Sequence, residues 1–120
     1  MMFNVEIVPR GKEYAVTETV VYDGREPEAW SDEDVAAVLK EILRAIDRAN
    51  NPAGEERPVT LRGFSWIIEP TDGHVVIAVD IPSGAAVAGP FDIEQKRLDE
   101  MMTRVTRTGR SGLPGSTSVH

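Results

Sequence analysis

The sequence lacks cysteine altogether, which excludes disulfide bonds, thiolate metal sites and thiol nucleophiles. Such an absence is typical of proteins in a reducing compartment. The longest uncharged apolar run, residues 75–79, is much shorter than the roughly 20 residues of a membrane-spanning helix. The amino-terminal segment has no basic stretch followed by an apolar run, as a secretory signal would. We therefore predict a cytoplasmic protein that has no membrane partner.

Motifs for cofactor and catalytic chemistry are also missing. There are two histidines, His74 and His120, and no HxH, HExxH or aspartate-rich calcium motif accompanies them. The sequence contains neither the GxSxG motif of a serine nucleophile nor the glycine-rich motifs of nucleotide-binding loops. We predict no metal, no cofactor and no catalytic residue, and we favour a binding function over an enzymatic one.

Acidic residues outnumber basic ones by 20 to 13, which gives a net charge of -7. The last acidic residue is Glu100, and it is followed by Arg104, Arg107 and Arg110. An acidic body repels the phosphate backbone of nucleic acids, which argues against them as the main partner. The same charge would suit a basic protein partner, although acidity also serves solubility alone. A basic protein therefore stays a candidate partner.

Hydrophobic periodicity predicts an α+β fold in the order ββαββα. The expected strands cover residues 3–7, 14–22, 59–69 and 75–81. The expected helices begin after the caps Ser31 and Asp92, and they end near Asn50 and Gly109. The prediction is thus a four-stranded antiparallel sheet with two helices in one domain, residues 1–110. Residues 111–120 have too few large apolar side chains to fold alone and are expected to form a flexible tail.

The two halves of the sequence share a spacing that suggests an internal pseudo-repeat. A displacement of 61 residues brings Pro9 onto Pro70, Val16 onto Ile77, Val20 onto Ile81 and Ser31 onto Asp92. Residue identity between the halves is low, so either duplication or ordinary supersecondary regularity explains the spacing.

Three polar side chains are candidates for a ligand-binding site: Glu18, His74 and Asp80. Glu18 lies between two valines on the strand face that alternation assigns to the core, where a carboxylate needs a partner. The alternative is an edge strand, which lets the carboxylate reach water. Asp80 could pair with Arg62. Together with the small-residue loop Ser83–Pro90, these groups would line the pocket of a small-molecule-binding domain or small enzyme, which is the alternative function.

The predicted interface consists of Phe64, Trp66 and Ile68. These residues alternate along one strand and so share a face, and we place them opposite Ala78 and Val76 of the next strand. Two helices can shield one face of a four-stranded sheet, which would leave this apolar face open to a partner. The competing arrangement has one helix on each face. We predict self-association through the open face as a twofold homodimer.

Overall fold

The computed structural model describes residues 1–52, 54, 59–61 and 63–108. Its elements are β1 (Met2–Pro9), β2 (Val16–Val21), the short 3₁₀ helix η1 (Pro27–Ala29), α1 (Asp32–Asn50), β3 (Ser65–Thr71), β4 (His74–Ile81), β5 (Gly84–Phe91) and α2 (Gln95–Thr108). The α+β class is confirmed, but the order is ββαβββα, with one strand more than predicted. The flexible tail predicted for residues 111–120 lies outside the described residues.

The strands form one antiparallel sheet of five strands in the order β2-β1-β5-β4-β3. The prediction of four strands was wrong, because most of the expected loop Ser83–Pro90 belongs to the central strand, β5. This segment is built largely of alanine and glycine, which are depleted in strands. It forms a strand nevertheless, because β1 and β4 supply backbone partners along both of its edges.

The first hairpin has the register that sequence alternation predicts. Ile7 pairs with Val16 and Phe3 pairs with Val20, so their side chains share one face of the sheet. Phe3, Ile7 and Val20 are buried there. The apolar residues of both strands therefore lie on the covered face of the sheet.

The second hairpin has a tighter turn than the predicted pairing of Trp66 and Ile68 with Ala78 and Val76 requires. Asp72 and Gly73 both have positive φ angles, 43° and 81°, and they form a two-residue turn that pairs Thr71 with His74. Two-residue turns with positive φ at both central residues match the twist of the flanking strands.

This turn shifts the pairing of β3 and β4 by one residue from the predicted one. Trp66 pairs with Val79 and Ile68 pairs with Ile77, whereas Ile67 pairs with Ala78. A shift of one residue moves every side chain of a strand to the other face. The placement of Trp66 and Ile68 on the face of Ala78 was therefore wrong.

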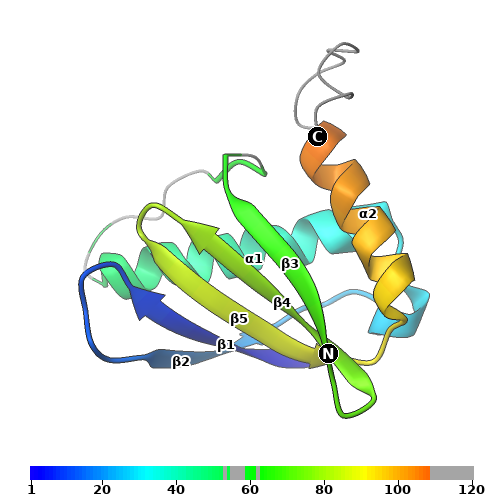
Figure 1. Cartoon of the computed structure of the whole chain (residues 1–120), viewed down its shortest axis with the longest axis horizontal. Helices are drawn as coiled ribbons and strands as arrows, with labels where there is room; N and C mark the ends of the chain where they lie inside the picture. The colour runs from blue at the N-terminus through cyan, green and yellow to red at the C-terminus, as the bar shows by residue number, and fades with distance from the viewer. Residues whose placement is uncertain (53, 55–58, 62, 109–120) are drawn as a thin grey trace.

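Both helices lie on the same side of the sheet, so the molecule has two layers (Figure 1). In this view α1 passes behind the strands and α2 stands beside β3. Ser31 caps α1 as predicted, in a reciprocal capping box with Asp34. The prediction for the second cap was wrong, because α2 begins at Gln95 rather than directly after Asp92. The side-chain amide of Gln95 instead donates a 3.0 Å hydrogen bond to the carbonyl of Ile68, which attaches α2 to β3.

The hydrophobic core lies between the two layers. Its largest fully buried side chains include Trp30, Leu39, Ile42, Ile77, Phe91, Leu98 and Met102. The pseudo-repeat relates β1, β2 and α1 to β3, β4 and α2, but it does not extend to β5. The segment 61 residues before β5 is the connection that contains η1.

Candidate interaction surface

Both helices lie on one side of the sheet, so its other face is open to solvent (Figure 1). A row of apolar side chains crosses this open face. Ile67 pairs with Ala78, and Ala78 pairs with Val87, so the row spans β3, β4 and β5. Ile67 is 53% exposed and Val87 is 43% exposed. We call this row and its apolar neighbours the open-face patch, which consists of Val8, Ile67, Val76, Ala78, Ala85 and Val87.

A shallow hollow of about 270 Å³ lies within the open-face patch. Ala78 and Ala85 line it, together with the longer side chains of Ile67 and Val87. Because alanine has a single methyl group, a side chain from a partner can approach the sheet closely at this point. The patch can therefore receive an apolar group over the alanines, between the side chains of Ile67 and Val87.

Carboxylates surround the patch, whereas cationic side chains are absent from all five strands that the structure describes. Three carboxylates each lie directly opposite a patch residue in the register: Glu6 opposite Val87, Glu69 opposite Val76 and Asp80 opposite Ala85. Asp80 has an exposed ion pair of 3.3 Å with Arg10, which comes from the loop after β1. The rim of the patch is acidic.

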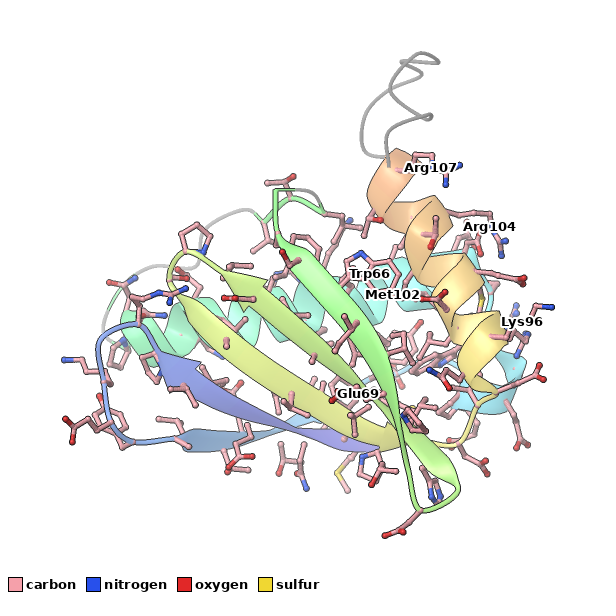
Figure 2. The ribbon with its side chains drawn as sticks, in the orientation of Figure 1. Trp66, Glu69, Lys96, Met102, Arg104 and Arg107 are labelled. Carbon is pink, nitrogen blue, oxygen red and sulfur yellow. The ribbon has the colours of Figure 1, made fainter. Side chains whose placement is uncertain are left out.

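The three residues predicted to form the interface lie outside the open-face patch. Ile68 is buried on the helix side of the sheet. Trp66 is half-buried and extends from β3 toward α2, in the direction of Met102 (Figure 2). Phe64 precedes β3 and packs against the core. Ile67 was not among the predicted interface residues, although the Asp-Gly dipeptide in the turn is a signal for the two-residue hairpin that exposes it.

The structure does not bring Glu18, His74 and Asp80 together. Glu18 lies on the helix side of the edge strand β2, where Arg48 of α1 donates to its carboxylate. His74 and Asp80 lie near opposite ends of β4, in the other half of the sheet. β2 is an edge strand, as the alternative explanation of Glu18 requires, and the carboxylate also has Arg48 as a partner. Asp80 pairs with Ser65 across the hairpin, and its expected partner Arg62 lies outside the described residues.

The buried charged residue of the described chain is Asp34, in the first turn of α1. Tyr22 donates a 2.6 Å hydrogen bond to its carboxylate, and the backbone amide and hydroxyl of Ser31 donate two more, at 2.9 and 3.1 Å. Burial acts to raise the pKa of Asp34, but these hydrogen bonds outweigh burial and lower the pKa below its ordinary 3.8. Burial, followed by the hydrogen bond to Asp34, raises the pKa of Tyr22 to about 12. This cluster fastens α1 to the end of β2.

A larger groove, of about 810 Å³, lies between the start of α1 and α2, but its cations already have partners. Arg104 makes two hydrogen bonds of 2.8 and 2.9 Å to Asp32. This pairing lowers the pKa of Asp32 and raises that of Arg104. Arg97 donates to the carbonyls of Glu28 and Trp30. These contacts join the two helices, so the groove is accounted for by the packing of the fold.

Among the described residues, no three metal-binding side chains cluster together. None of the helices that the structure describes is long and apolar enough to cross a membrane. Comparisons of the chain with protein-family models, curated proteins and solved structures found no significant match.

Proposed function

We propose that the protein is a non-enzymatic interaction domain that binds another protein chain through the open-face patch. The observation that carries this proposal is the placement of both helices on one side of the sheet, which leaves the row Ile67, Ala78 and Val87 uncovered. Apolar residues that adjoin one another on a soluble domain, with a polar rim around them, are typical of protein-binding surfaces.

Two kinds of partner are compatible with an apolar patch of this kind. One is a second copy of the chain, as expected from the sequence, because a twofold dimer lets one patch serve both subunits. The other is a basic protein, since the chain has a net charge of -7. In both cases the contact residues are Ile67 and Val87, in place of Trp66 and Ile68.

The alternative function, a small enzyme or ligand-binding domain, has weaker support. It needs Glu18, His74 and Asp80 to line a common pocket, but Glu18 lies on β2 and the other two residues lie near opposite ends of β4, with two strands between β2 and β4. The two carboxylates also have structural partners: Glu18 forms an ion pair across the two layers, and Asp80 forms one with Arg10 of the loop after β1.

The double variant Ile67→Ser/Val87→Ser tests whether the patch serves binding rather than folding. Exposed side chains contribute little to folding, so the free energy of unfolding should stay within about 1 kcal/mol of wild type. Any self-association that the wild type displays in sedimentation velocity, from low to high micromolar concentration, should be lost. Tyr14→Ser is the matched control, because Tyr14 is a comparably exposed apolar residue outside the strands. A loss of several kcal/mol in the double variant would contradict the proposal, since the patch would then stabilise the fold itself.

A further inference from the structure

We infer that the partner of the open-face patch is a basic amphipathic helix of another protein. This inference rests on the proposed function and names the chemistry of the partner. It follows from the charges around the patch, the spacing of those charges and the kind of contact that a sheet face can make.

The carboxylates around the patch that lack an ion pair with a described residue favour a cationic partner. Glu6 and Glu69 are exposed, and neither makes an ion pair with a described residue. Asp80 is the third carboxylate, and its partner Arg10 also donates to the carbonyls of Pro82 and Ile81. No strand of the described sheet supplies a lysine or arginine to offset Glu6 and Glu69.

The same charges disfavour a second copy of the chain. A face-to-face dimer would bring the carboxylates of both subunits to one interface, with no cation from either sheet to separate them. Like charges placed together across an interface cost several kcal/mol and suppress such pairings. A partner that carries lysine or arginine at its edges removes this cost and gains attraction.

The spacing of the two free carboxylates matches the width of a helix. Glu6 lies on β1 and Glu69 on β3, and β5 and β4 run between them. Three strand spacings of about 4.8 Å separate the two strands by roughly 14 Å. An α-helix with its side chains is about 10–12 Å wide, so it fits over the patch between them. Long basic side chains on its two flanks can extend to Glu6 on one side and Glu69 on the other.

The kind of contact also favours a helix over an extended peptide. The strands β1, β5 and β4, which carry most of the patch, are paired on both edges, so the middle of the patch offers side chains rather than free backbone groups for strand addition. A helix presents successive apolar side chains on one stripe and can place a large one in the hollow between Ile67 and Val87. The helices α1 and α2 cover the other side of the same sheet in this way.

A labelled peptide of about 18 residues, built of leucine and lysine in an amphipathic helical pattern, is the probe. Its helix would be about 27 Å long, which matches a strand of eight residues. A peptide with the same leucines and with glutamate in place of lysine is the control. Fluorescence anisotropy should detect binding of the lysine peptide, weakened by added salt, and no binding of the glutamate peptide.

Two variants locate the binding on the patch. Glu6→Gln/Glu69→Gln should weaken binding of the lysine peptide roughly 2- to 30-fold, the range expected for two exposed ion pairs. Ile67→Ser should weaken it by about fivefold or more, because an apolar contact is lost. Glu33→Gln/Asp99→Asn changes the net charge by the same amount with exposed residues on the helices, and it should leave the affinity unchanged.

The outcomes separate this inference from the proposed function. Equal weakening by both charge variants, or equal binding of both peptides, would overturn the inference and leave the proposed function in place. Self-association that Ile67→Ser abolishes, with no peptide binding, would assign the patch to a second copy and also overturn the inference. A wild type that neither self-associates nor binds either peptide would count against both proposals.

Discussion

The two faces of the sheet are built from the same strands, but alternate residues have different roles: those on one face pack against the helices and those on the other are turned toward solvent. On the face that the helices cover, large apolar side chains such as Ile7 and Ile77 are almost fully buried, and the central strand adds the alanines Ala86 and Ala88 and the ring of Phe91. On the open face, Ile67 and Val87 stand among carboxylates, threonines and small residues. The covered face therefore holds the layers together, and the open face keeps apolar groups at the surface at little cost to folding. The following substitutions test this contrast, from the largest expected effect to the smallest.

A matched pair of isoleucines gives the largest contrast between the faces. Ile77→Ala, on the covered face, should lower the free energy of unfolding by about 2–5 kcal/mol, because it removes buried contacts and leaves a cavity. Ile67→Ala, on the open face, should change it by about 0.5 kcal/mol or less. Urea denaturation followed by circular dichroism measures both values. Similar losses in the two variants would mean that the open face also stabilises the monomer.

A substitution in the cluster around Asp34 tests how strongly α1 is attached to the end of β2. Tyr22→Phe removes the 2.6 Å hydrogen bond to a buried carboxylate and should cost about 1.5–3 kcal/mol of stability in urea denaturation. The variant should keep its helical circular dichroism, since Ser31 still caps α1. A change below about 0.5 kcal/mol would indicate that the hydroxyl adds little to the attachment of α1.

The same cluster makes stability depend on pH at both extremes. The pKa of Asp34 is lower in the fold than its ordinary 3.8, so its contribution is present above pH 3.8 and is lost as pH falls through the lowered value. The pKa of Tyr22 is raised from 10.0 to about 12, so its contribution is complete below pH 10 and is lost as pH rises toward 12. Urea denaturation across pH should show both losses, and Tyr22→Phe should reduce the alkaline one. An unchanged alkaline loss in that variant would assign it to other groups.

A substitution in the central strand β5 tests how closely its backbone approaches that of β1. A Cβ atom at Gly84 would lie 2.7 Å from the carbonyl oxygen of Val8, which belongs to the backbone of β1. Gly84→Ala should therefore cost about 1–3 kcal/mol, as overpacking usually does. Ala85→Ser, the next residue and on the open face, is the control and should change stability by about 0.5 kcal/mol or less. Denaturation curves that coincide for the two variants would argue against this close approach of β1 and β5.

The smallest changes in the free energy of unfolding are expected when single carboxylates are replaced by amides. Glu18→Gln breaks the ion pair with Arg48 across the two layers and should cost about 0.2–1 kcal/mol, because both side chains are partly exposed. Glu69→Gln, on the open face and without an ion pair to a described residue, should cost less than Glu18→Gln does. The reverse order in urea denaturation would mean that the open-face carboxylates contribute to folding.

The sequence by itself determined the elements whose signals are local. Alternation in the first hairpin, the Ser31 cap and the apolar periodicity of α1 each depend on neighbouring residues, and each prediction agrees with the structure. The edge-strand explanation of Glu18 was also available, although the sequence could not choose it over a buried site. What these elements share is that strand period, helix period and capping chemistry act within a few residues.

Tertiary structure alone decided the central strand, the register of the second hairpin and which face stayed open. Segment 84–91 has poor strand propensity, and it becomes a strand because β1 and β4 are positioned to pair with it. A turn shorter by one residue exchanged Trp66 for Ile67 on the open face, since alternate side chains point to opposite sides. The choice of covered face depends on where both helices pack, and that choice balances contacts between residues far apart in the chain. Local patterns carry no information about such contacts, so the candidate binding surface emerged only with the assembled sheet.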